Sequence, residues 1–141
     1  MRRRHLLTTA IMGDLMLAHA TQRGIAGLVV NGAVRDVDSI RAQALPLYAA
    51  GVTHRGPYKD GPGDINLAVA IDGMVVEPGD LVLGDVDGVL AVPFDAVPAV
   101  LAAAEAKKAA EEREMAAILA GTSDRSWVLR TLESRGCETE E

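Results

Sequence analysis

Aromatic residues are scarce in this chain of 141 residues, because Phe, Trp and Tyr together make up only 3% of it. A hydrophobic core must therefore be built from aliphatic side chains, and few rings are left to stack on nucleic-acid bases. The formal net charge of −6 acts in the same direction, since an acidic surface repels phosphate backbones. These two features together argue against direct binding of nucleic acid.

Cysteine is almost absent, since Cys137 in the polar C-terminal segment is the only one. Without a second cysteine, the chain can form neither an internal disulfide nor a zinc site of clustered cysteines. No apolar run approaches the roughly 18–20 residues that are needed to cross a bilayer. We therefore expect a cytoplasmic protein that does not bind a membrane.

Apolar patterning predicts alternating helices and strands, followed by a β-rich region and two further helices. The result is a mixed sheet with helices packed on it and a C-terminal helical arm. The expected elements in chain order are a helix over 14–23, a strand over 25–30 ending in a tight turn at Asn31-Gly32, a helix over 37–43, a strand over 45–51, a long loop over 52–66, three strands between 67 and 93 with hairpin turns at Asp72-Gly73 and Asp87-Gly88, a long helix over 94–120, and a short helix over 123–134 opened by Ser123 or Asp124.

The N-terminal segment MRRRHLLTTAIMGDLMLAHATQRG allows two incompatible interpretations. Its three arginines, its apolar run and Ala18-His19-Ala20 resemble a secretory signal peptide with a small-residue cleavage site. Alternatively, Gly13-Asp14-Leu15-Met16 is a loop that opens a helix, with Asp14 in an active site. The charge of Asp14 interrupts the apolar run, which disfavours the export signal, so we prefer the second interpretation.

Several other motifs are better explained as turns or surface residues. GDVDGV at 84–89 lacks the later ligands of a calcium loop, and no glycine-rich dinucleotide motif follows a strand. The three histidines lack the spacing of a metal site and are interpreted as surface or partly buried residues: His5, His19 and His54.

The more informative pattern is Asp14, then twenty residues, then Arg35-Asp36. Arg35-Asp36 lies where the predicted strand passes into a helix, the place where open α/β folds commonly bind ligands. From the residues alone, Asp36 could equally be a helix N-cap and Arg35 a surface cation. The spacing therefore defines a candidate site and leaves its chemistry open.

Together with GLVVNGAVRDVD, RGPYKDGPGDIN and GMVVEPGDLVLGDVDGVLAVP, this spacing resembles the RraA-like family. That family contains 4-hydroxy-4-methyl-2-oxoglutarate/4-carboxy-4-hydroxy-2-oxoadipate aldolases and the regulator of ribonuclease activity A. The resemblance runs from about Ile11 to the end of the long helix. It implies an α/β fold, a mixed β-sheet sandwich with flanking helices (swivelling β/β/α-like). Residues 1–141 would form one domain without the family's N-terminal elements, with a core over about 11–93 and a C-terminal helical arm over about 94–135.

The resemblance also implies a class II aldolase that uses a divalent metal cation, Mg²⁺ or Mn²⁺. Such an enzyme cleaves 4-hydroxy-4-methyl-2-oxoglutarate-type 2-oxo acids to pyruvate and decarboxylates oxaloacetate through the same enolate. Fixed positive groups beside the keto oxygen lower the barrier to forming that enolate. The implied roles are metal binding by Asp36, holding of the keto acid by Arg35, holding of the metal's waters by Asp14, and binding of the substrate carboxylate by the backbone amides of Gly13, Asp14, Leu15 and Met16.

Family members assemble as trimers or pairs of trimers, so the resemblance predicts a homotrimer or hexamer. Arg55 and Lys59 could meet a dicarboxylate, and a carboxylate of Glu111, Glu112 or Glu114 could complete a neighbour's site. Two other functions stay open: a non-catalytic regulator that binds a ribonuclease, and an inactive truncated paralogue.

Overall fold

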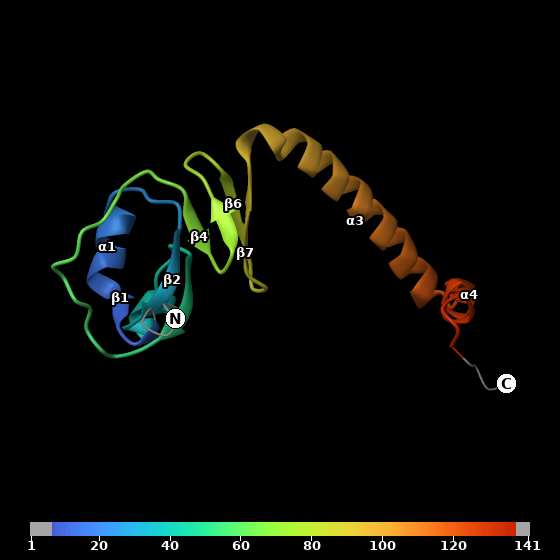
Figure 1. Cartoon of the computed structure of the whole chain (residues 1–141), viewed down its shortest axis with the longest axis horizontal. Coiled ribbons are helices and arrows are strands. Elements are labelled where there is room, and N and C mark those ends of the chain that lie inside the picture. Colours follow the sequence, from blue (N-terminus) through green and yellow to red (C-terminus); the bar gives the residue numbers. More distant parts are fainter. Residues whose placement is uncertain (1–6, 138–141) are drawn as a thin grey trace. The chain divides into compact units, whose positions relative to one another are not determined.

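The computed structural model describes residues 7–137, which contacts along the chain divide into two compact units between Phe94 and Asp95. The first unit contains all the strands, and the second contains the helices α3 and α4 (Figure 1). The basic cluster Arg2-Arg3-Arg4 and His5, with the start of the stretch that resembles a signal peptide, lie outside the described residues.

The first unit is built on a parallel three-stranded sheet in the order β1-β2-β3. Its strands are β1 (Ala10–Met12), β2 (Leu28–Val34) and β3 (Leu47–Val52). Helices α1 (Asp14–Gln22) and α2 (Val37–Arg41) connect them, as parallel strands require crossovers. Because the strands are parallel, the carboxyl ends of all three lie at one edge of the sheet.

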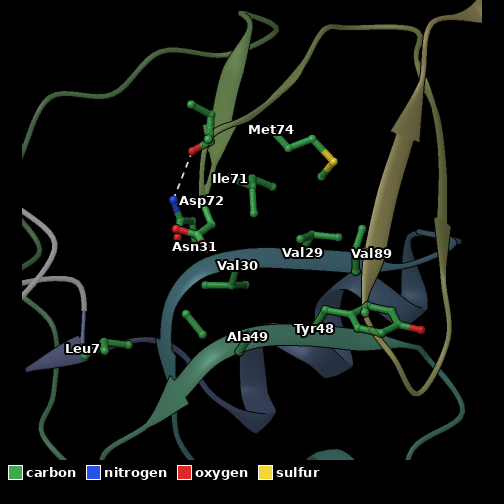
Figure 2. A pocket seen from close by; sticks show the side chains of 14 residues that line it. Leu7, Val29, Val30, Asn31, Tyr48, Ala49, Ile71, Asp72, Met74 and Val89 are labelled. Atoms are coloured by element: carbon green, nitrogen blue, oxygen red, sulfur yellow. Dashed lines mark hydrogen bonds between the residues drawn. The ribbon is translucent and has the colours of Figure 1, made fainter. Parts of the chain in front are cut away.

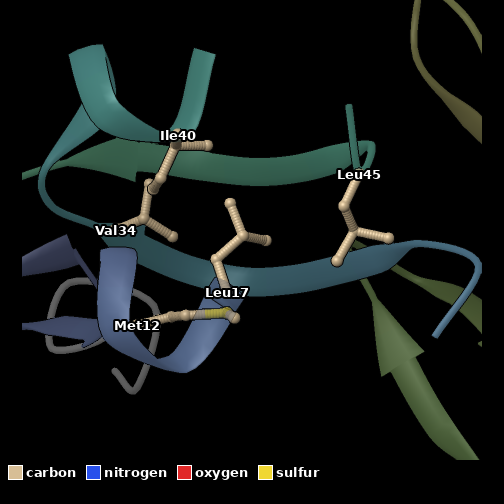
Figure 3. Close-up of a cluster of buried hydrophobic side chains, with 5 residues drawn as sticks. All are labelled: Met12, Leu17, Val34, Ile40 and Leu45. Atoms are coloured by element: carbon tan, nitrogen blue, oxygen red, sulfur yellow. The ribbon is translucent and has the colours of Figure 1, made fainter. Parts of the chain in front are cut away.

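A small aliphatic core joins the helices to the sheet, as Figure 3 shows. Leu17 of α1 is completely buried at its centre, and Gly24, with a φ of 68°, ends the turn after this helix. The predicted helix over 14–23 is confirmed in this way. The members of the core cluster are Met12, Leu17, Val34, Ile40 and Leu45.

The predicted tight turn at Asn31-Gly32 is wrong, because β2 continues through these residues to Val34. The register of β2 against β3 shifts between Val30 and Ala33, so a β-bulge accommodates the two turn-forming residues. The side-chain amide of Asn31 donates a hydrogen bond to the carbonyl of Ala70, 3.0 Å away. This long-range contact outweighs the local preference of Asn-Gly for a turn.

The β-rich region contains four strands where three were predicted, because the turn at 78–80 separates two hairpins. The first pairs β4 (Val69–Ile71) with β5 (Met74–Val76), and the second pairs β6 (Leu81–Gly84) with β7 (Val89–Val92). The predicted Asp-Gly turns are confirmed at both hairpin tips. In the first, φ is 47° at Asp72 and 97° at Gly73, as a tight two-residue hairpin turn requires.

The division between the units falls within η2 (Phe94–Ala96), and the second unit contains α3 (Val97–Leu119) and α4 (Ser126–Ser134). Asp124 precedes α4, where its carboxylate accepts a 2.8 Å hydrogen bond from the backbone amide of Ser126. That backbone bond, together with one from the Ser126 side chain, lowers the pKa of Asp124. Of the two alternatives for opening this helix, the structure therefore favours Asp124. No helix within residues 7–137 is long and apolar enough to cross a membrane.

Much aliphatic surface stays exposed in both units. Leu81, Val82 and Leu83 of β6 are each 40–46% exposed, although successive strand residues point to opposite faces. Neither face of this hairpin is therefore fully covered. In the second unit, α3 and α4 contain no buried residue.

Replacement of Leu17 by alanine tests the core. Because Leu17 is 0% exposed, Leu17→Ala removes buried methyl groups and should lower the free energy of unfolding by about 2–4 kcal/mol. The matched control is Leu15→Ala on the same helix, where the side chain is 76% exposed and the expected change is within about 0.5 kcal/mol. Urea denaturation followed by circular dichroism measures both; equal effects would contradict this core.

Candidate active site at the strand ends

The candidate site forms where backbone pairing continues past the ends of the parallel strands. The amide of Arg35 donates a 2.9 Å hydrogen bond to the carbonyl of Met12, and the amide of Thr53 donates a 3.0 Å bond to that of Val34. Three chain segments that are distant in sequence thus lie next to one another: Gly13-Asp14, Arg35-Asp36 and Thr53-His54.

Asp36 adopts an unusual conformation at the start of α2, with a φ of 58° in the left-handed region. Asp36 is the N-cap residue of α2, and its carbonyl accepts a 3.0 Å hydrogen bond from the amide of Ile40, but its side chain makes no capping hydrogen bond. Instead, Oδ2 accepts a 3.3 Å hydrogen bond from the amide of Asp14 and lies 3.5 Å from Nε of Arg35. The left-handed backbone directs the carboxylate toward the loop between β1 and α1.

Gly13 occupies a position that has no room for a side chain. A Cβ atom there would lie 2.5 Å from Oδ2 of Asp36 and 3.1 Å from Nε of Arg35. The backbone of Gly13 is extended, with a φ of −143°, which any residue can adopt. A side chain at position 13 would therefore make the side chains of Asp36 and Arg35 move, whereas the backbone conformation itself does not call for glycine.

The first turn of α1 carries the other predicted residues. The amide of Leu15 donates a 2.7 Å hydrogen bond to Oδ1 of Asp14, while the side chains of Leu15 and Met16 are exposed. Helix N-termini attract anions because their amides lack intrahelical acceptors. In this structure, carboxylates of the protein already accept from the amides of Asp14 and Leu15. A ligand carboxylate at the Leu15 amide would replace that of Asp14.

A hollow of about 340 Å³ opens beside Arg35 and Asp36, between the ends of β2 and β3. The Arg35 and Asp36 side chains are 44% and 39% exposed, so both are accessible to a ligand. Sequence reasoning did not place Thr53 and His54, which line the hollow, in the site. Their position could have indicated this, because Thr53 and His54 directly follow β3, which is parallel to β2, the strand that Arg35 follows. The remaining lining residues are Val37, Asp38 and Val52.

A divalent metal would find few protein ligands here. Residues 7–137 contain no group of three histidine, cysteine, aspartate or glutamate side chains that could hold a metal ion. The carboxylates of Asp14 and Asp36 nevertheless come from adjacent segments, joined by the bond from the Asp14 amide to Asp36. Such a donor set fits Mg²⁺, which keeps several waters and accepts one or two carboxylates, better than it fits Zn²⁺.

The long loop and α3 carry the further charged residues that the resemblance singled out. The carbonyl of Arg55 accepts a 2.8 Å hydrogen bond from the amide of Ala10, which ties the start of the long loop to β1. Lys59 lies further along that loop. The three glutamates belong to α3, in the second unit, where Glu111 and Glu112 pair with Lys107 and Lys108 and Glu114 accepts a hydrogen bond from Ser123. Completion of a neighbour's site by one of them stays a prediction.

A larger hollow of about 850 Å³ lies on the other part of the first unit, between the three-stranded sheet and the hairpins (Figure 2). Its lining is mostly apolar and contains none of the predicted site residues. Side chains that line it include Val29, Val30, Tyr48, Ile71, Met74 and Val89. The polar site and this larger hollow are therefore separate features.

The charged residues Asp14, Arg35 and Asp36 follow the carboxyl ends of parallel strands, which is where α/β proteins commonly bind ligands. A family model described as RraA-like, Aldolase/RraA, matches residues 3–91. The chain belongs to the RraA-like family, as its motifs predicted, and it has the mixed α/β architecture of that family with C-terminal helices.

Related proteins carry two kinds of name. A protein of Halalkalibacterium halodurans, provisionally named a 4-hydroxy-4-methyl-2-oxoglutarate aldolase, is 40% identical over 111 residues, which cover 79% of this chain and 53% of the relative. A Thermus thermophilus protein named 4-hydroxy-4-methyl-2-oxoglutarate aldolase is 37% identical, and the match covers 62% of this chain and 53% of the Thermus protein.

A solved structure adds the second kind of name. Streptomyces coelicolor RraAS2 is described as an unusual member of the RNase ES inhibitor RraA protein family. It is 29% identical with a TM-score of 0.69, and the match covers 76% of this chain and 55% of the RraAS2 chain. This chain thus spans about half the length of the relatives it matches.

The packing at Gly13 yields a testable expectation. Gly13→Ala forces a Cβ against Asp36 and Arg35, so the free energy of unfolding should fall by about 1–3 kcal/mol. Gly63→Ala is the matched control, because a Cβ at Gly63 meets nothing within 4 Å. Thermal and urea denaturation compare the two variants, and equal stability would show that the loop at Gly13 does not pack as described.

Proposed function

We propose that this protein is a divalent-metal-dependent aldolase that cleaves 4-hydroxy-4-methyl-2-oxoglutarate-type 2-oxo acids to pyruvate, with oxaloacetate decarboxylation as a side activity. The observation that carries the proposal is the meeting of Gly13, Asp14, Arg35 and Asp36 at one edge of the sheet. The names of the two related aldolases support it.

In the proposed reaction, the substrate hydroxyl loses its proton and the bond between C3 and C4 breaks. The electron pair of that bond passes to the keto oxygen, which gives the enolate of pyruvate, and C3 is then protonated. Asp36 would hold a Mg²⁺ or Mn²⁺ ion, and a metal bound there would supply Lewis-acid stabilisation of the developing negative charge. Residues of the chain itself bind the substrate and move the proton.

Arg35 binds the keto oxygen and stabilises the enolate, because its guanidinium stays charged and presents several donors in a plane. The amides of residues 13–16 at the start of α1 bind the substrate carboxylate. Asp14 then holds water beside the substrate, through which the hydroxyl proton leaves. Gly13 permits the close approach of these groups, since a larger residue would displace Asp36.

A second candidate function is contact inhibition of a ribonuclease without catalysis. It is favoured by the likeness to S. coelicolor RraAS2, which is described as belonging to a family of RNase ES inhibitors. The net charge of −6 is compatible with this candidate, because such an inhibitor contacts the enzyme and need not bind RNA.

Asp36→Asn tests the proposed chemistry. Asparagine keeps the shape of the side chain and tolerates the left-handed backbone at this position, which alanine does less well. Loss of the metal-binding charge should lower pyruvate release from 4-hydroxy-4-methyl-2-oxoglutarate by at least about 100-fold, and EDTA should do the same to the unchanged protein. A coupled lactate dehydrogenase assay measures the pyruvate.

The matched control is Asp72→Asn, which changes a second aspartate with positive φ, at the hairpin tip. Its turnover should equal that of the unchanged protein. Full activity in EDTA would refute the metal-dependent mechanism. Inhibition of RNase ES by both the unchanged protein and Asp36→Asn, with no pyruvate release by either, would favour the second candidate.

We also propose that the chain assembles as a homotrimer or hexamer. The exposed leucine and valine side chains on both faces of β6, and the absence of buried residues in α3 and α4, leave apolar surface that association would cover. Burial of such surface contributes about 25 cal/mol per Å².

Light scattering after size exclusion tests this assembly and should give three or six times the chain mass of 14.8 kDa. Val82→Lys on β6 should dissociate the assembly, because it would bury an unpaired charge. Asp87→Lys in the adjoining turn removes no apolar surface, because this residue is already charged and exposed, and it should leave the mass unchanged. A monomer at tens of micromolar would contradict the proposal.

A further inference from the structure

We infer that Gly56, in the long loop after β3, is a positioning residue for Arg35. Its lack of a side chain leaves the space in which the guanidinium lies when it is directed at the keto oxygen of the substrate. The inference rests on the proposed function and adds to it a residue that acts through Arg35. No motif in the sequence distinguished Gly56 from the other glycines of this loop.

Backbone hydrogen bonds attach the start of the loop to two strands of the parallel sheet. The amide of Thr53 donates a 3.0 Å bond to the carbonyl of Val34 at the end of β2. The carbonyl of Arg55 accepts a 2.8 Å bond from the amide of Ala10 in β1, the strand that pairs with β2. Gly56 follows directly, so the pairing of its neighbours brings its backbone to the site.

Two glycines lie against different parts of the Arg35 side chain. A Cβ at Gly13 would lie 3.2 Å from Cγ of Arg35 and 3.1 Å from Nε, and a Cβ at Gly56 would lie 3.7 Å from Nη1. Oδ2 of Asp36 is 3.5 Å from Nε. Gly13 and Asp36 thus hold the inner part of the side chain, and Gly56 is the backbone next to its Nη1 end.

Space, and not backbone conformation, is the reason for this role of Gly56. Gly56 does not adopt the positive φ that favours glycine. A single methyl group 3.7 Å from Nη1 would make an ordinary van der Waals contact. A valine would fill two of the three staggered positions on that Cβ and crowd the guanidinium. Because the Arg35 side chain is 44% exposed, it can turn toward solvent, which moves its charge away from the keto oxygen.

A graded pair of substitutions tests the inference. Gly56→Val should lower kcat for 4-hydroxy-4-methyl-2-oxoglutarate cleavage and for oxaloacetate decarboxylation by at least about 10-fold, because both reactions form an enolate at Arg35. Gly56→Ala should lower both by less than about 3-fold, because one methyl group fits. The matched control is Gly61→Val in the same loop, where a Cβ meets nothing within 4 Å, and both rates should stay unchanged.

Equal losses in Gly56→Ala and Gly56→Val would show that the loop needs the backbone freedom of glycine at this position, and unchanged rates in both would show that the space has no role. Either result overturns the inference while the proposed function stands.

Arg35→Lys shows whether Gly56 acts through Arg35. Lysine keeps the charge but has no Nη1 atom, so adding Gly56→Val to Arg35→Lys should lower kcat by less than about 2-fold further. If the two losses multiply instead, Gly56 has a purely structural role and the inference is overturned.

NMR of the arginine Nε–H groups supplies a readout that does not depend on turnover. The Arg35 signal is identified by its loss in Arg35→Lys. It should shift in Gly56→Val and keep its position in Gly61→Val, and an unshifted signal in Gly56→Val would overturn the inference. If the unchanged protein releases no pyruvate from either acid while the Arg35 signal responds as expected, the proposed function fails and the packing of Gly56 on Arg35 stands.

Discussion

The parallel pairing of β1, β2 and β3 beyond their formal ends is the constraint on which the site depends. Two backbone hydrogen bonds, from Arg35 to Met12 and from Thr53 to Val34, hold three separate chain segments at one edge of the sheet. Each segment contributes the residues directly after its strand: a glycine and a helix start, an ion pair, and a polar loop. Without this pairing, Asp14 and Asp36 would be charges on unrelated surface turns.

Around that edge, backbone conformation and close packing take the place of burial. The side chains of Arg35 and Asp36 are both partly exposed, so burial does not fix their conformations. The left-handed backbone of Asp36 orients its carboxylate, and Gly13 lets the neighbouring loop approach within hydrogen-bond distance. A site ordered in this way stays open to water and to small acids.

Sequence reasoning predicted the features that depend on local pattern. Gly24 ended the turn after the first helix, Asp72-Gly73 formed a tight hairpin, and the spacing from Asp14 to Arg35-Asp36 identified three residues that the fold brings together. The failures had several causes. Asn31-Gly32 continues a strand because Asn31 bonds to Ala70, and β1 is too short to give a periodic signal. Asp36 is the N-cap that the local pattern allowed, but the hydrogen-bond partner of its side chain lies 22 residues away, where no local pattern could place it.

Gly13 and Asp36 occupy one shared volume, since the carboxylate oxygen sits where a side chain at position 13 would begin. The conformations of the two residues are consequently tied. A side chain at position 13 would turn the carboxylate of Asp36 away from this volume, and the hydrogen bond from the Asp14 amide would be lost with it. The smallest residue of the loop thus sets the direction of the charge that faces it.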